Sequence, residues 1–116
     1  MNLLDELREL GADISDGMKR FANNGALYEK MLRKFPAAAA GLPVEMYFAS
    51  GDTDTALANA HTLKGMTGNL SLTPLYTAYT DIVALLREGK PDQARNILND
   101  ILPVQEQFIR CIEKQA

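Results

Sequence analysis

The C-terminal part of the chain carries the apolar spacing that most constrains the fold. After Pro91, apolar side chains recur at alternating intervals of three and four residues, at Ala94, Ile97, Ile101, Val104, Phe108 and Cys111. This spacing places them on one stripe of an α-helix, the pattern of a seam in a helical bundle. Because a helix must bury such a stripe against another element, the rest of the chain has to supply partner helices.

The remaining segments repeat the helical spacing and contain no long β-branched run with two-residue alternation. Each is bounded by a residue that favours a helix end or start, such as Gly11, Asp52 or Gly89. We expect helices over 3–10, from Asp13 or Ser15 through Phe21, from Asn24 or Gly25 through Phe35, and over 44–49, 53–70, 74–88 and 91–111. The sequence therefore predicts an all-α protein.

Prolines divide these helices, because proline is tolerated in the first helical turn and resisted inside a helix. We interpret residues 36–43 as a kink or short break despite the alanine run within them. Thr73 is the expected cap of the following helix, with Pro74 at its first position. Pro103 should bend the last helix without ending it. The prediction is a single domain, residues 1–116, folded as an antiparallel four-helix bundle with one or two short extra N-terminal helices.

Composition excludes several functions. The chain has 116 residues, 47% of them hydrophobic, and a net charge of −3 from 12 basic and 15 acidic residues. It contains no basic run for nucleic acid, no apolar stretch long enough for a membrane and no signal-peptide layout at its start. One cysteine allows no internal disulfide, and one histidine with one cysteine makes no zinc site. We therefore expect a cytoplasmic monomer with no metal of its own.

The only histidine, His61, lies on a helical stripe with Lys64, Gly65 and Gly68. The opposite side of the same helix carries Ala56, Leu63, Met66 and Leu70, so the apolar side faces the core and the imidazole faces water. Glycine inside a helix costs about 1 kcal/mol relative to alanine, so two glycines near His61 need a reason. That reason is the close approach of another molecule, the close approach of a neighbouring helix, or, for Gly68, the helix end.

A neutral imidazole is a good nucleophile near neutral pH and can carry a phosphoryl group. Lys64, one turn from His61, could attract the phosphoryl oxygens, and the glycines would leave room for them. Leu57 and Ala58 lie beside His61 by helical angle and predict an apolar docking surface for a protein. The chain has neither a Gly-x-Ser-x-Gly turn nor a glycine-rich phosphate loop, so the phosphate donor and any Mg²⁺ must come from a partner.

The segment around His61 resembles the histidine-containing phosphotransfer (HPt) domain family. His61, Lys64 and Gly65 match the family pattern His-x-x-Lys-Gly, and Ala60 and Gly68-Asn69-Leu70 match its usual bacterial frame. The likeness spans residues 12–112 and includes the segments 16–21, 27–28, 32–35 and 49–52. Three positions depart from the family: Asn59 replaces a frequent aliphatic residue, and Ser71 and Leu72 replace a frequent Gly-Ala pair.

This resemblance implies a phosphorelay intermediate that is not itself a kinase. His61 would accept a phosphoryl group from a receiver-domain aspartate and pass it to another receiver domain. Lys64 would assist electrostatically, Gly65 would permit close approach, and Leu57, Ala58 and Gly68 would contact the partner. The family needs no cofactor of its own, since the receiver holds the Mg²⁺. The implied partners are response-regulator receiver domains and a hybrid sensor histidine kinase.

Two other functions remain open at this point. The dimerisation and phosphoacceptor part of a sensor kinase also presents histidine on a helical bundle. There an acidic residue usually follows the histidine, whereas here Thr62 follows it and no ATP-binding region is present. A non-catalytic helical adaptor, in which His61 is incidental, is the second alternative.

Overall fold

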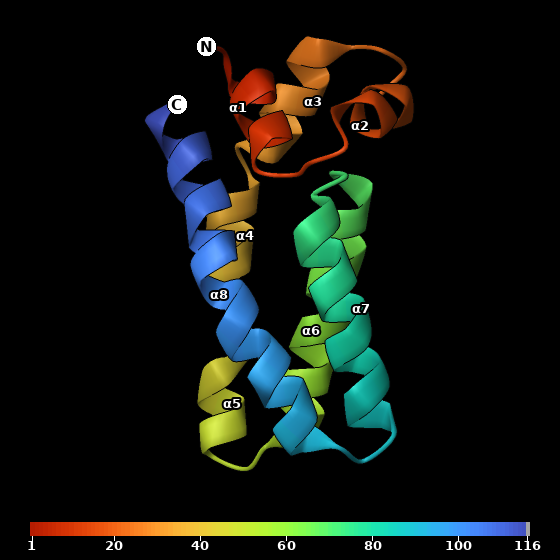
Figure 1. Cartoon of the computed structure of the whole chain (residues 1–116), viewed down its shortest axis with the longest axis vertical. Coiled ribbons are helices and arrows are strands. Elements are labelled where there is room, and N and C mark those ends of the chain that lie inside the picture. The colour runs from red at the N-terminus through yellow and green to blue at the C-terminus, as the bar shows by residue number, and fades with distance from the viewer. Residues whose placement is uncertain (116) are drawn as a thin grey trace.

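The computed structural model of the chain describes residues 1–115 and contains helices and no strand within that range. The helices are α1 (Leu3–Glu9), α2 (Ile14–Arg20), α3 (Gly25–Leu32), α4 (Phe35–Ala40), α5 (Glu45–Ala49), α6 (Thr53–Asn69), α7 (Thr73–Arg87) and α8 (Pro91–Lys114). They form an elongated body with extents of 40 × 24 × 21 Å (Figure 1). The all-α prediction is confirmed.

The three long helices α6, α7 and α8 run along the body, and each packs against the next (Figure 1). Both α4 and α5 lie against α8, and α5 also contacts α6. The short helices α1, α2 and α3 gather at the end where both chain termini lie. Large side chains from these short helices and from the three long helices are fully buried in one core, among them Leu7, Tyr28, Leu63, Ile82 and Phe108. Because these helices share one core, α6 is held in place by α7 on one side and by α5 on the other.

Local capping sets where several helices begin. Asp13, Asn24 and Asp52 each accept a hydrogen bond from a backbone N–H three residues on, as a helix N-cap does. Asp52 is held twice by Thr55, whose hydroxyl and N–H both donate to it, and these bonds keep the pKa of Asp52 below its usual value. Asn2 caps α1 in the same way, which the sequence analysis did not identify. The start of the histidine-bearing helix α6 is therefore fixed locally.

The predicted break over residues 36–43 is wrong in its first half. Helix α3 ends at Leu32, and residues Phe35–Ala40 form α4, with Pro36 in its first turn. Proline costs nothing there, since the N–H that it lacks would have no helical partner. At Pro74 the cap is one residue from its predicted place, because Thr73 begins α7 and Leu72 precedes it as the N-cap residue.

The buried stripe of α8 also differs from the predicted seam. Ala94 and Phe108 are fully buried as expected, but the other fully buried residues are Leu98 and Ile112. Ile97, Ile101, Val104 and Cys111 are only half-buried. Helix α8 packs against α1, α4, α5 and α7 together, so its contact surface is wider than one seam. The helix continues through Pro103, as predicted, and ends at Lys114, three residues beyond the predicted range.

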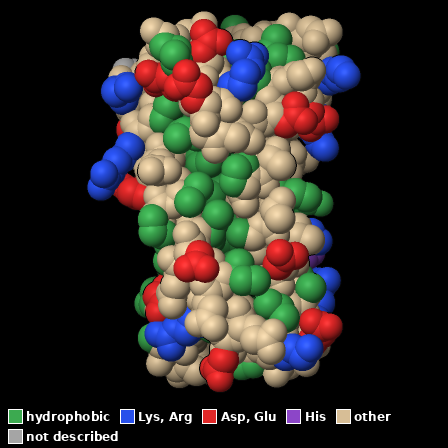
Figure 2. Space-filling view, viewed as in Figure 1, with side chains coloured by type: hydrophobic (Ala, Val, Ile, Leu, Met, Phe, Trp, Pro, Cys, Tyr) green, Lys and Arg blue, Asp and Glu red, His purple; other side chains and the backbone are tan. Residues whose placement is uncertain are grey.

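On the face drawn in Figure 2, acidic and basic side chains are interspersed, and no large area carries a single sign. None of the helices in residues 1–115 combines the length and the apolar composition that crossing a membrane requires. Exposed large hydrophobic side chains are few, and the most exposed of them within a helix is Met46 in α5.

Candidate functional site

His61 lies in the middle of α6 with its side chain exposed to solvent. The residues that turn inward from the same helix are Ala56, Ala60, Leu63 and Thr67. Within residues 1–115, neither His61 nor Lys64 takes part in an ion pair. The imidazole is therefore positioned by its helix and is accessible to another molecule.

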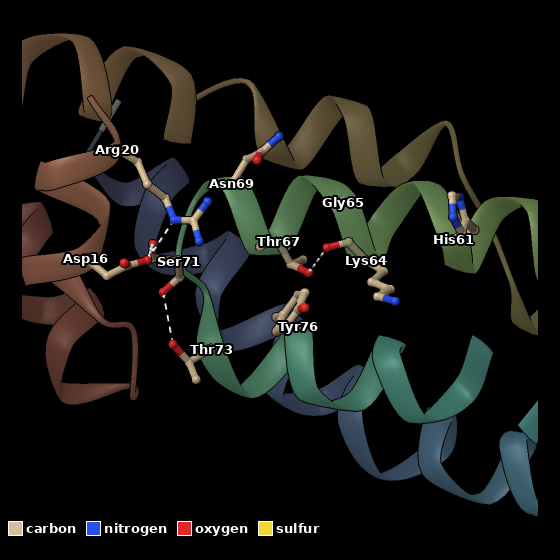
Figure 3. Close-up of a pocket in the computed structure, with 11 residues that line it drawn as sticks. Asp16, Arg20, His61, Lys64, Gly65, Thr67, Asn69, Ser71, Thr73 and Tyr76 are labelled. Carbon is tan, nitrogen blue, oxygen red and sulfur yellow. Dashed lines mark hydrogen bonds and ion pairs between the residues drawn. The ribbon is translucent and has the colours of Figure 1, made fainter. Parts of the chain in front are cut away.

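A surface pocket of about 450 Å³ begins at His61 and extends along α6 toward its C-terminal end. Its lining comes from α2, α6, the turn after α6 and the start of α7: Asp16, Arg20, His61, Lys64, Gly65, Thr67, Gly68, Asn69, Ser71, Thr73 and Tyr76. Figure 3 shows His61 toward one end of this pocket and Arg20 at the other, with α6 between them. The structure thus brings four predicted site residues, His61, Lys64, Gly65 and Gly68, into one concave surface.

The two glycines of this pocket have different surroundings. A Cβ built on Gly65 would have no neighbouring atom within 4 Å, so nothing within the chain requires glycine there. A Cβ built on Gly68 would lie 3.0 Å from the ring of Tyr76, a distance tighter than most van der Waals contacts. The close approach expected at Gly68 is therefore made by α7 of the same chain, and only Gly65 leaves open space.

Lys64 is half-buried one turn after His61, and its side chain extends from α6 toward α7 (Figure 3). Thr67 contacts the backbone of this turn of α6. Its buried hydroxyl donates to the carbonyl oxygens of Leu63, at 2.8 Å, and of Lys64, at 3.2 Å. A cation one helical turn from His61 can stabilise negative charge that develops on a group attached to the imidazole.

The far end of the pocket contains residues that the sequence analysis did not assign to the site. Arg20 Nε donates to Asp16 Oδ2 at 2.7 Å, and the Ser71 hydroxyl donates to the same oxygen at 2.7 Å. The Arg20 bond, followed by the Ser71 bond, lowers the pKa of Asp16. Asp16 and Arg20 are spaced as an i,i+4 pair, which predicts only a surface ion pair, so their place in the pocket follows from the docking of α2.

Two of the three departures from the HPt pattern are explained by hydrogen bonds to other segments of the chain. Asn59 is half-buried, and its side-chain amide donates to the carbonyl oxygen of Pro43 at 2.6 Å, which ties α6 to the segment between α4 and α5. Ser71 has a left-handed backbone, with φ of 55°, a conformation that glycine adopts most easily. Its hydroxyl is satisfied by Asp16, so serine occupies the position with a polar contact that glycine lacks.

Leu57 and Ala58, the other predicted partner contacts, lie on the turn of α6 before His61 and outside the pocket. Leu57 is half-buried and Ala58 is exposed. The two residues therefore flank His61 on the side away from Arg20.

Within residues 1–115, no group of three or more histidine, cysteine, aspartate or glutamate residues is placed to hold a metal ion. The chain matches no known protein-family model, and comparisons with curated proteins and with solved structures also find no match. Function is therefore inferred from the residues of the site.

Proposed function

We propose that this chain is an HPt-type phosphocarrier in which His61 accepts a phosphoryl group from a receiver-domain aspartate and returns it to another receiver. The observation that carries the proposal is the exposed His61 beside Gly65, a helical glycine whose missing side chain leaves space open to solvent. The His-x-x-Lys-Gly resemblance supplies the family, and the pocket along α6 supplies room for a partner.

In the proposed step, the unprotonated ring nitrogen of His61 attacks phosphorus in line with the aspartyl oxygen. The bond from phosphorus to that oxygen breaks as the bond from phosphorus to nitrogen forms, and the aspartate leaves as a carboxylate with the electron pair. Lys64 offsets negative charge on the phosphoryl oxygens during the transfer. Gly65 lets the partner's active site reach the imidazole, and the partner contributes the Mg²⁺.

We also propose that the fold is a four-helix bundle in which α4 and α5 together take the place of the fourth helix. Both contact α8, and α5 contacts α6, so the pair lines the side of the body that α7 leaves open. Helices α1, α2 and α3 would then be the extra N-terminal helices, three where the sequence predicted one or two. In this interpretation the domain works as a cytoplasmic monomer, and its partners are receiver domains and a hybrid sensor kinase.

The test uses two phosphate donors of different size. A receiver domain charged with acetyl phosphate and Mg²⁺ must dock on the chain, whereas phosphoramidate is small enough to reach His61 without docking. We expect both to label the wild-type chain, with a label that is acid-labile and alkali-stable, as for phosphohistidine. His61→Gln should take up no label from either donor. Equal labelling of this variant would contradict the proposal and favour the adaptor function.

Lys64→Ala separates the role of the cation from that of the nucleophile. Lys64 makes no ion pair in residues 1–115, so its removal should leave the thermal unfolding temperature nearly unchanged. Transfer from the receiver should slow by about tenfold, equivalent to about 1.4 kcal/mol of transition-state stabilisation. Unchanged single-turnover rates would remove Lys64 from the mechanism while leaving His61 in place.

Sedimentation equilibrium tests the sensor-kinase alternative. A dimerisation fragment would be a dimer at micromolar concentration, whereas the proposed phosphocarrier is a monomer.

A further inference from the structure

A second pocket, of about 630 Å³, opens on the other side of the C-terminal half of α6. Its lining is mainly apolar and comes from α2, α3, α4 and α6 and their flanking turns: Phe21, Met31, Phe35, Ala38, Met66 and Leu70, with Arg20, Lys34 and Asn69. Phe35 and Leu70 are almost fully buried, whereas Met31 and Met66 are half-buried. The buried Phe35 and Leu70 therefore form the fixed apolar base of the pocket. The flexible side chains of Met31 and Met66 form its sides and can move when another side chain enters.

Both charged side chains that line this pocket are positive. Arg20 and Lys34 line it, and no aspartate or glutamate does, although the whole chain carries a net charge of −3. Arg20 Nε donates to Asp16, and the terminal guanidinium nitrogens of Arg20 make no hydrogen bond within residues 1–115. Lys34 takes part in no ion pair within residues 1–115. The pocket thus combines an apolar interior with a cationic rim, which favours an apolar group flanked by carboxylates.

The two pockets lie on opposite flanks of one helix and meet at its end. Lys64 and Met66 are two positions apart, so at about 100° per residue they point about 200° apart around α6. Arg20 and Asn69 line both pockets. Gly65 and Asn69 are exposed on the ridge between the flanks. A protein that rests on this ridge to reach His61 therefore also covers the apolar pocket.

The distance along the helix decides what the cationic rim can act on. Asn69 is eight residues after His61, which corresponds to about 12 Å along α6. Arg20 is at that end of the helix, so it is too far from His61 to contact a phosphoryl group there (Figure 3). Its charge can act only on the protein that carries the phosphoryl group.

We propose that this pocket, lined by Met31, Phe35, Met66 and Leu70 and rimmed by Arg20 and Lys34, is the anchor site for the receiver domain. The occupant is an apolar side chain on the receiver surface with one or more acidic residues next to it. This inference rests on the proposed phosphocarrier function, and it assigns partner selection to residues outside the His61 stripe.

The first test measures the kinetics of phosphoryl transfer to a receiver after the charge at Lys34 is reversed. The receiver is the one that phosphorylated wild-type chain transfers to fastest in a profile of the source organism's receivers. Lys34→Glu should raise the KM for this receiver about tenfold and leave kcat within twofold, because it affects docking and not chemistry. Lys90→Glu, which makes the same charge change at the start of α8, should leave both parameters unchanged. Ala38→Phe fills the pocket without adding charge and should raise KM in the same way.

Methionine-methyl NMR provides a second readout that does not depend on turnover. Addition of the same receiver, uncharged, should shift the methyl resonances of Met31 and Met66. The resonance of Met1, which is 73% exposed at the chain start and lines neither pocket, should not move. Unmoved Met31 and Met66 resonances at saturating receiver would overturn the proposal.

Labelling by phosphoramidate separates this inference from the proposed function. If Lys34→Glu and wild type are labelled equally at His61 but also transfer to the receiver with equal KM, the anchor site is wrong and the phosphocarrier function stands. If His61→Gln is labelled like wild type, the function itself fails. A wild-type dimer in sedimentation equilibrium that Lys34→Glu converts to a monomer would show a second copy in the pocket, which also contradicts the proposal.

Discussion

At the scale of single residues, Gly65 and Gly68 show that neighbouring glycines on one stripe can have different causes. Gly68 leaves room for the ring of Tyr76, so its small size serves the packing of α6 on α7. Gly65 has no neighbour that would contact a side chain, and a helix interior penalises glycine. The fold therefore gives no reason for glycine at this position, and the proposed close approach of a partner would supply one.

This difference predicts how substitutions of the two glycines change the stability of the chain, and how a bulky side chain at Gly65 changes phosphoryl transfer. Gly65→Ala should raise the free energy of unfolding by up to about 1 kcal/mol, the usual gain for this change inside a helix. Gly68→Ala should gain less, because the new methyl group meets Tyr76 at 3.0 Å. Urea unfolding measures both. Gly65→Leu should remain folded but lose transfer from the charged receiver while keeping its labelling by phosphoramidate.

A Gly68→Ala gain as large as that of Gly65→Ala would show that Tyr76 moves aside without cost. Unimpaired receiver transfer by Gly65→Leu would remove the close approach from the mechanism.

At the scale of elements, α2 and α3 form a cap that positions one wall of the site. The buried Tyr28 hydroxyl of α3 donates to the carbonyl oxygen of Leu70 at 2.7 Å, and burial raises the pKa of Tyr28 to about 12. The Asp13 N–H donates to the Ser71 carbonyl at 2.9 Å, so both ends of the cap are tied to the turn between α6 and α7. Arg20 reaches the pocket because of these contacts.

Gly17 is the position where the cap is most tightly packed. A Cβ there would lie 2.3 Å from Tyr28, which is fully buried and cannot move away cheaply. Gly17→Ala should therefore lower the free energy of unfolding by about 1–3 kcal/mol, as overpacking does. Gly25→Ala is the matched control, since its Cβ would meet Met18 at an ordinary 3.7 Å. Equal effects of the two changes in urea unfolding would contradict the packing argument.

At the scale of the whole molecule, the first and last helices are joined through Glu6. Its carboxylate accepts hydrogen bonds from Gln115, at 2.9 Å, from Lys114, at 3.1 Å, and from Cys111, at 3.3 Å. Together these bonds, with that from Gln115 the largest cause, lower the pKa of Glu6 from 4.5 to about 2. Burial, followed by the contact with Glu6, raises the pKa of Cys111 to about 11, so this cysteine remains a neutral thiol that donates to Glu6.

The lowered pKa predicts a pH dependence with a defined sign. Since the folded chain holds Glu6 ionised more strongly than the unfolded chain, the stabilisation is complete above pH 4.5 and is lost as the pH falls toward 2. Glu6→Gln removes it at every pH. The difference in urea midpoint between wild type and this variant should therefore be largest near pH 7 and shrink below pH 4.5. A difference that stays constant down to pH 2.5 would contradict this assignment.

Much of the fold could be predicted because its signals are local. Asp13, Asn24 and Asp52 act as caps through bonds to residues three positions on, and the 3.6-residue period shows which side of α6 turns inward. The errors occur where distant contacts decide. Residues 35–40 remain helical where α4 packs against α8, and the buried stripe of α8 follows four neighbouring helices rather than one.

By itself, the sequence determined that the chain is helical, where most helices begin, and that His61 faces solvent with Lys64 and Gly65 beside it. These features depend on residues within one or two turns of each other, so the local order of side chains is sufficient. Only the tertiary structure decided what stands on either side of α6. Tyr28 bonds to a residue 42 positions away and Ser71 to one 55 positions away, and these contacts bring Arg20 to the His61 pocket. No local pattern encodes such pairings, because they arise when the whole core packs at once.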